Sequence, residues 1–188
     1  MNYNDYKISR TLAWELILNE NITALPVNMT SLCRNLGIRL QPYEGHVDGV
    51  DDDGESTIMP DGVPLIVYNR QKPRPRKRFT VAHELGHILL GHVGQYQLVN
   101  REPSPNDNPI EQAANVFASR LLAPACVLWA LNTQTPVEIA ELCDISLQAA
   151  EYRAARMEEL RRRNKFLISP VERQVYNQFL PYIKNKLH

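Results

Sequence analysis

The sequence predicts an α+β fold that is mostly helical and contains a small β-sheet. Several long segments repeat their apolar residues at the period of a helix. Two shorter apolar segments flank Pro60-Asp61-Gly62, a composition typical of the turn between paired strands. The chain has 188 residues, 44% of them hydrophobic, which suffices for one core and a small second lobe.

The N-terminal part is expected to run helix, helix, strand. Apolar residues between about Asp5 and Asn19 follow a helical period and predict an amphipathic helix. A short helix from Met29 to Leu36 follows, with Gly37 as its stop, and residues 38–43 then alternate in the manner of a strand.

An acidic loop and a hairpin come next. Residues 45–55 carry five acidic side chains among glycines, a composition that also suits a calcium loop. Their spacing does not match that of an EF-hand, so a solvated loop is the preferred interpretation. Thr57–Met59 and Val63–Tyr68 are the expected strands of the hairpin, and the second is apolar enough to be largely buried.

The segment QKPRPRKR, residues 71–78, is expected to be a hydrated connector ahead of a helix from Phe79 to His92. A nucleic-acid patch is the alternative, which the absence of interleaved aromatic residues disfavours. Three prolines within residues 101–109 predict a loop. Residues 110–122 then predict another helix that stops before Pro124.

Composition excludes several classes of function. Lys and Arg total 21, and Asp and Glu total 21, so no global charge steers the chain toward nucleic acid, membrane or an acidic substrate. Trp14 and Glu15 interrupt what would be the apolar part of a secretory signal, and no apolar run approaches the roughly 18 residues that cross a bilayer. Cys33, Cys126 and Cys143 are odd in number and widely spaced, which disfavours disulfides and a zinc finger. A soluble, cytoplasmic protein with buried cysteines is expected.

The sharpest motif is His83-Glu84-Leu85-Gly86-His87, an H-E-x-x-H arrangement on the predicted helix. Residues four apart on a helix are turned by about 400°, so His83 and His87 project from one face and can bind one ion. Imidazole suits zinc, and Glu84 can reach a zinc-bound water and activate it as the general base of peptide hydrolysis. Apolar neighbours place the helix in the core, where these polar side chains require a reason such as a metal.

A catalytic zinc normally takes three protein ligands, so a third is needed. His92 fails the metzincin spacing, because Leu90 and Val93 stand where that pattern requires Gly and His. On a continuing helix His92 would lie about 140° from His87, so it is expected to cap the helix end or face solvent. Glu102 lies in the proline-rich loop, where nothing fixes its direction. Glu111 is preferred, because it opens a helix whose alanines permit close approach; its alternative role is to complement the positive end of that helix.

Two blocks of sequence resemble the ImmA/IrrE family of metallopeptidases. They are RFTVAHELGHILLGH at residues 78–92 and E-x-x-A-N-x-F-A-x-x-L-L-x-P at residues 111–124, and the strand GVPLIVYN at 62–69 and the N-terminal helices extend the similarity over roughly residues 5–130. The resemblance implies a zincin-like, more narrowly gluzincin-like, domain with His83, His87 and Glu111 on zinc and Glu84 as general base. It also implies a substrate class, since members cut or inactivate helix-turn-helix repressors in phage, mobile-element or stress regulons.

The C-terminal third resembles a helix-turn-helix unit, with one helix starting at Pro136 and Ser146 as the N-cap of a second. DNA binding would use Gln148, Tyr152 and Arg156 of the second helix, but its glutamates would repel phosphate, so DNA binding is disfavoured. The helix pair is instead expected to pack on the catalytic domain or to help dock the repressor. Residues 164–188 predict a terminal helix ending near Pro181. The expected domains are 1–130, the metallopeptidase domain, and 131–188, a helical subdomain.

The predicted function is that of a zinc-dependent endopeptidase that hydrolyses a peptide bond in a helix-turn-helix repressor. The alternatives are a non-proteolytic, metal-containing regulator that acts by protein or DNA binding, and a toxin–antitoxin component. Manganese, cobalt or iron would also suit the same ligands. Tyr68, Arg120 and His92 are all open candidates for stabilising the oxyanion, and the scissile bond, the activating signal and the oligomeric state are open as well.

Overall fold

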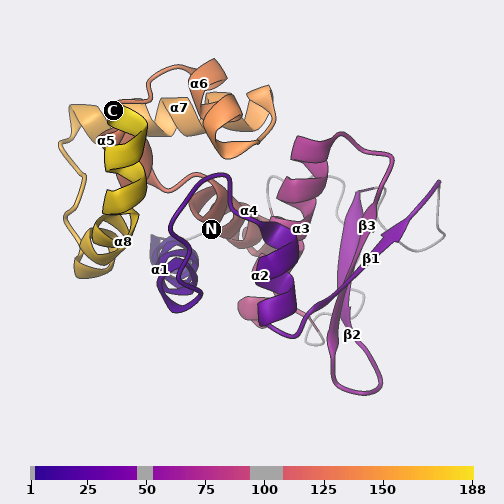
Figure 1. Ribbon diagram of the computed structural model, residues 1–188. Coiled ribbons are helices and arrows are strands. Elements are labelled where there is room, and N and C mark those ends of the chain that lie inside the picture. The colour runs from indigo at the N-terminus through magenta and orange to yellow at the C-terminus, as the bar shows by residue number, and fades with distance from the viewer. Residues whose placement is uncertain (1–2, 46–52, 94–107) are drawn as a thin grey trace. The chain divides into compact units, whose positions relative to one another are not determined.

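The computed structural model describes residues 3–45, 53–93 and 108–188 (Figure 1). The chain forms two compact units, one of Met1–Arg10 with Asn28–Ala118 and the other of Thr11–Val27 with Ser119–His188. The expected domain division at residues 130 and 131 stays a prediction, because a compact unit is not by itself a domain that folds alone.

The first unit is built around a three-stranded sheet of order β1-β3-β2, with bounds Arg39–Tyr43 for β1, Gly54–Ile58 for β2 and Pro64–Asn69 for β3. Strands β2 and β3 form the predicted antiparallel hairpin, and Gly62 N–H donates to the carbonyl of Met59 in its turn. Strand β1 pairs with β3 in parallel. The central strand is the most buried, as Ile66 has no exposed surface.

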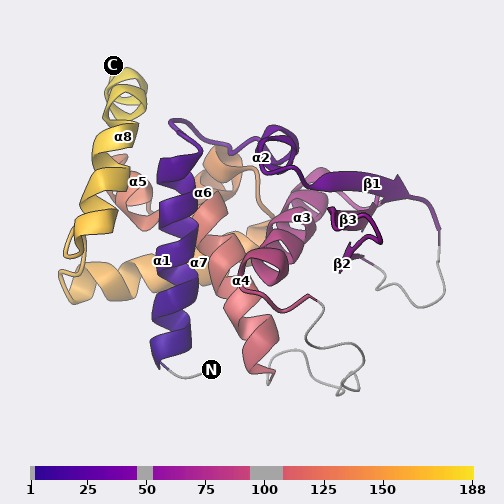
Figure 2. The same ribbon diagram turned by 90° about the horizontal axis from the view of Figure 1, so that it is seen from below.

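Helix α3, Arg74–Leu89, packs against β2 and β3, and Figure 2 shows it running beside the strands. It begins five residues before the predicted start, so the interpretation of residues 71–78 as a connector is wrong from Arg74 onward. Proline is well suited to the first helical turn, where its missing N–H would have had no partner, and Pro73 and Pro75 occupy the start of α3. Asp53 forms ion pairs with Arg76 and Lys72 of this basic stretch.

Helix α2, Met29–Asn35, completes the described part of this unit together with the ends of two longer helices. Asn28 caps α2 by accepting a hydrogen bond from Ser31 N–H, and Gly37 follows its end as predicted. Helix α1, Tyr3–Asn19, and helix α4, Pro109–Leu122, each continue from this unit into the other. The loop assignments for Asp48, Asp51 and Asp52 and for Glu102 lie outside the described residues.

The second unit is helical throughout its described elements: α5, Ala125–Ala130; α6, Pro136–Cys143; α7, Leu147–Arg162; and α8, Pro170–Leu187. The expected starts of α6 and α7 are confirmed, with Thr135 in a capping box and Ser146 as N-cap. Helix α5 was not expected. The described residues of the chain are thus rich in helix and contain one small sheet, which agrees with the predicted α+β fold.

The prediction that the last helix ends near Pro181 is wrong, because α8 runs on to Leu187. Proline removes one backbone hydrogen bond, but Pro181 is exposed, so water can satisfy the carbonyl that it leaves free. Ile183 is buried, and Tyr182 donates its hydroxyl proton to the carbonyl of Leu25. Packing of the last turn therefore offsets the local cost of the proline.

The three cysteines are free and buried, as predicted. One stretch of the described residues, Pro109–Ala130, is long and apolar enough to cross a membrane by length and composition, so the expectation that no stretch approaches this length is wrong. The most apolar 18 residues of this stretch are 72% buried within the fold, as is usual for a core helix of a globular protein.

Candidate metal centre

The H-E-x-x-H residues lie in the middle of α3, where the helix is regular and one face is fixed in the core. Val81, Ala82 and Leu85 are buried and hold that face. His83 and His87 project together from another face, one turn apart, with 15% and 12% of their side chains exposed. Their Nε2 atoms are 3.0 Å apart. The predicted alignment of the two imidazoles is therefore present.

Glu111 reaches the same point from α4 because α3 and α4 approach closely at Gly86. A Cβ at position 86 would lie 3.0 Å from Cδ1 of Phe117 and 3.3 Å from Cα of Ala114. Both Phe117 and Ala114 are fully buried, so the contact is a packed one. The glycine within the motif thus lets the second helix bring its carboxylate to the histidines.

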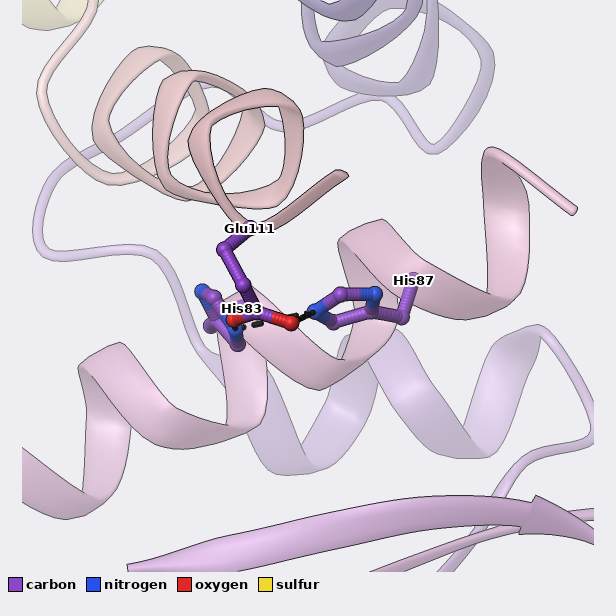
Figure 3. Close-up of side chains that lie close together, drawn as sticks. All are labelled: His83, His87 and Glu111. Atoms are coloured by element: carbon purple, nitrogen blue, oxygen red, sulfur yellow. Dashed lines mark hydrogen bonds and ion pairs between the residues drawn. The ribbon is translucent and has the colours of Figure 1, made fainter. Parts of the chain in front are cut away.

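The three side chains converge, as Figure 3 shows. Glu111 Oε2 lies 3.1 Å from Nε2 of His83, and Oε1 lies 3.4 Å from Nε2 of His87. One ligand atom from each residue falls within 4.8 Å of the others. Two nitrogens bound tetrahedrally to one zinc at about 2.0–2.1 Å lie roughly 3.3 Å apart, close to the spacing found here. Two neutral nitrogens and a carboxylate oxygen also form a donor set that suits zinc, so the residues fit a divalent metal.

The remaining nitrogen of each imidazole is engaged by a different residue. Nδ1 of His83 lies 3.0 Å from Oδ1 of Asn115, one turn after Glu111 on α4. Nδ1 of His87 lies 3.0 Å from Nδ1 of His92. An amide oxygen only accepts, so His83 donates from Nδ1, and its Nε2 faces the shared point, where it would present a lone pair to a metal.

The backbone of Glu84 lies in α3, but its side-chain carboxylate is oriented by a residue of the sheet. The hydroxyl of Ser56 on β2 donates a 2.6 Å hydrogen bond to its Oε2. Burial raises the pKa of Glu84, and this effect outweighs the lowering by His83, by the Ser56 hydrogen bond and by His87. A carboxylate with a raised pKa is better suited to take up and return a proton near neutral pH.

The electrostatics of the other groups follow from the same cluster. Hydrogen bonds from His83 and then His87 lower the pKa of Glu111, so it is a carboxylate in all ordinary conditions. Burial is the largest influence on His83 and would lower its pKa, but the hydrogen bond that Glu111 accepts from it and the charges of Glu84 and Glu111 together raise it. Burial, followed by the charge of His87, lowers the pKa of His92 to about 4.

The expectation for His92 is confirmed in part: its backbone N–H caps the end of α3 at the carbonyl of His87, but its ring lies against the ring of His87, with 5.1 Å between the centroids. His92 would point away from His87 only if α3 continued as a helix. Instead α3 ends at Leu89, and the chain turns back at Gly91. Two other contacts were missed. No local pattern marks Asn115 as a partner of His83, and nothing in a strand sequence marks Ser56 as a partner of Glu84. Among the candidates for oxyanion stabilisation, Tyr68 is half-buried on β3, and Arg120 donates to Oγ of Ser119.

Comparison with known proteins decides the family. Residues 33–155 match the M78 peptidase family model, described as the IrrE N-terminal-like domain. The chain belongs to the M78 peptidase family. This match supports the resemblance to ImmA/IrrE proteins and covers every residue of the cluster, from Ser56 on β2 to Asn115 on α4. No curated protein matches the chain.

Membership of the M78 peptidases makes the protein a metallopeptidase in general terms and implies a divalent metal. His83, His87 and Glu111 are the candidate site for that metal among the described residues. The family match extends 25 residues beyond residue 130 into the helices α6 and α7, so the matched region is longer toward the C-terminus than the two motifs alone suggested.

Proposed function

We propose that the protein is a zinc-dependent endopeptidase that hydrolyses a peptide bond in a helix-turn-helix repressor, with Glu84 as general base. The observation that carries this proposal is the convergence of two imidazole nitrogens and one carboxylate within 4.8 Å in a member of the M78 peptidases. A structural zinc site usually has four protein ligands, whereas three leave a position for the reaction.

The proposed chemistry uses the residues of the cluster in defined roles. Zinc held by His83, His87 and Glu111 would polarise the scissile carbonyl and acidify the attacking water. Glu84 accepts a proton from that water while the water oxygen forms its bond to the carbonyl carbon. Glu84 then delivers the proton to the amide nitrogen as the C–N bond breaks, which yields a carboxylate and an amine.

Ser56 supports the same cycle. Its hydroxyl occupies Oε2 of Glu84, and Oε1 has no hydrogen-bond partner among the described residues. Oε1 is therefore the oxygen that we expect to take the proton, because neither of its lone pairs is engaged by a described residue. Burial around Glu84 keeps competing water away and makes the proton easier to hold between the two steps.

The substrate class is proposed from the resemblance to ImmA/IrrE proteins, members of which act on helix-turn-helix repressors. A repressor bound to DNA in the cytoplasm would place the peptidase in the same compartment, and the three reduced, buried cysteines agree with that location. The arginines at the end of α7 do not favour DNA as the partner. Arg156 and Arg163 pair with Glu159, and Arg161 donates to the carbonyl of Thr133, so these cations are already engaged.

The test is incubation of the zinc-loaded protein with the repressor encoded beside it, followed by mass spectrometry of the fragments. Glu84→Gln keeps the shape of the side chain and removes the base, so it should bind zinc and leave the repressor intact. Glu15→Gln, at an exposed position on α1, is the matched control and should cut normally. Cleavage by Glu84→Gln at an undiminished rate would exclude this mechanism. If the repressor stays intact and the Glu84→Gln protein still relieves its repression of transcription, the non-proteolytic regulator would be favoured.

A further inference from the structure

The end of helix α3 has an unusual partner for a metal ligand. The N–H of Gly91 donates to the carbonyl of Ile88 at 3.1 Å, and the N–H of His92 donates to the carbonyl of His87 at 2.9 Å. This pair of bonds, with Gly91 at φ +74°, is the Schellman arrangement that commonly ends helices. It brings the residue after the glycine back onto the last full turn of the helix.

In most Schellman ends the side chains that meet at this point are apolar. Here they are two imidazoles, with Nδ1 of His92 3.0 Å from Nδ1 of His87. Two nitrogens at this distance share one proton in a hydrogen bond, so one ring donates and the other accepts. The opposite nitrogen of His87, Nε2, faces His83 at 3.0 Å and Glu111 at 3.4 Å.

The direction of the bond follows from what each ring must do. Nε2 of His87 has to present a lone pair to a metal, which requires the ring proton to be on Nδ1. His87 is then the donor and Nδ1 of His92 the acceptor. In the same way, Oδ1 of Asn115 accepts a hydrogen bond from Nδ1 of His83. Each metal-facing imidazole is therefore oriented by its own hydrogen-bond acceptor.

We infer that His92 is a positioning residue that fixes the tautomer and ring orientation of His87 for metal binding. The inference rests on the proposed metal site and concerns a residue outside the ligand set. Partners of this kind typically raise metal affinity by 10–100-fold. His92 itself does not contact the metal.

A matched pair of substitutions isolates the accepting atom. In asparagine Oδ1 occupies nearly the position of Nδ1 in histidine, and leucine has the same branched shape without an acceptor. His92→Leu should weaken zinc affinity by about 10–100-fold, measured by competition with a chelating dye, whereas His92→Asn should stay within a few-fold of the natural protein. His188→Leu, at the exposed C-terminal residue, controls for the loss of a histidine and should change nothing.

Nitrogen-15 NMR of the zinc-loaded protein gives a second readout that a purely structural role would not produce. His87 should carry its proton on Nδ1, and His92 should carry its proton on Nε2. In His92→Leu the Nδ1 proton of His87 should move upfield and exchange faster with water, because it has lost its acceptor. Circular dichroism and thermal melting establish that each variant is folded.

The outcomes separate this inference from the proposed function. If the natural protein binds no zinc, the proposed metal site itself fails. If it binds zinc and both variants bind equally well, His92 does not position His87. Equal weakening in both variants would also overturn the inference, because the imidazole would then be needed for something other than accepting this hydrogen bond. A proton on Nδ1 of His92 would overturn it as well.

Discussion

The hydroxyl of Ser56 lies 2.6 Å from Oε2 of Glu84, so an edge strand of the sheet holds the carboxylate of the H-E-x-x-H motif. Strand β2 and helix α3 are separated in sequence by β3, and their packing supplies the contact. The proposed general base therefore depends on the strand for its direction, while the two histidines depend on the helix.

Ser56→Ala should lower kcat/KM for repressor cleavage by about 10- to 150-fold at neutral pH, because a hydrogen bond to a charged group is worth about 1.5–3 kcal/mol. The hydroxyl lowers the pKa of Glu84, so its removal raises that pKa further. The base works as a carboxylate, and the acidic limb of the pH–rate profile should hence move to higher pH. Ser56→Thr keeps the hydroxyl and should behave like the natural protein. An acidic limb that stays in place in Ser56→Ala would contradict this role.

Adding zinc should raise the melting temperature, and EDTA should reverse the rise. A ligand that binds only the folded state stabilises it by about 2.7 kcal/mol at a free concentration of 100 times Kd. His83→Ala and Glu111→Ala each remove one ligand, so the zinc-dependent shift should shrink in both. Glu15→Ala should keep the full shift. A shift of equal size in all four proteins would mean that zinc binds elsewhere.

Gly86→Ala should destabilise the protein and weaken zinc binding, because its Cβ would press on the fully buried Phe117. Overpacking of a core costs about 1–3 kcal/mol, and the better helix propensity of alanine returns up to about 1 kcal/mol. A net loss of about 1 kcal/mol is expected in chemical denaturation. Phe117→Leu in the Gly86→Ala background should recover part of it, since the smaller side chain leaves room. A Gly86→Ala protein that is more stable than the natural one would show that Phe117 moves aside without cost.

Gly91→Ala tests the helix end without touching either imidazole. No atom of the described residues lies within 4 Å of a Cβ at this position, so the substitution clashes with none of them and acts through the left-handed φ of +74°. That conformation costs alanine about 1–2 kcal/mol. Stability should fall by this amount in a urea titration, and zinc affinity should fall with it if the chain moves His92 away. Unchanged stability would mean that the turn adopts another conformation.

The local parts of the fold were predictable because their signals lie within a few residues. Pro60-Asp61-Gly62 marked the hairpin, Ser146 marked the start of α7, and the four-residue spacing of His83 and His87 placed both on one face. Glu111 was predicted from the small residues of its helix, and it lies within reach of both histidines.

The features that the sequence did not predict depend on contacts between distant segments or on backbone conformation. The parallel pairing of β1 with β3 and the bond from Ser56 to Glu84 join segments that no local pattern connects. The position of His92 depends on a left-handed residue at Gly91, which a helical wheel does not represent. Pro181 was expected to end α8, but tertiary packing of Ile183 carries the helix past it.

The turn at Gly91 also limits how the chain can change in length. The ring of His92 contacts the ring of His87 because α3 ends between them and Gly91 adopts a left-handed conformation. One inserted residue there would rotate the following side chain by about 100° and carry it out of reach of Nδ1. Insertions and deletions between these two histidines should therefore weaken zinc binding about as much as loss of the His92 side chain, although neither event would alter the H-E-x-x-H motif itself.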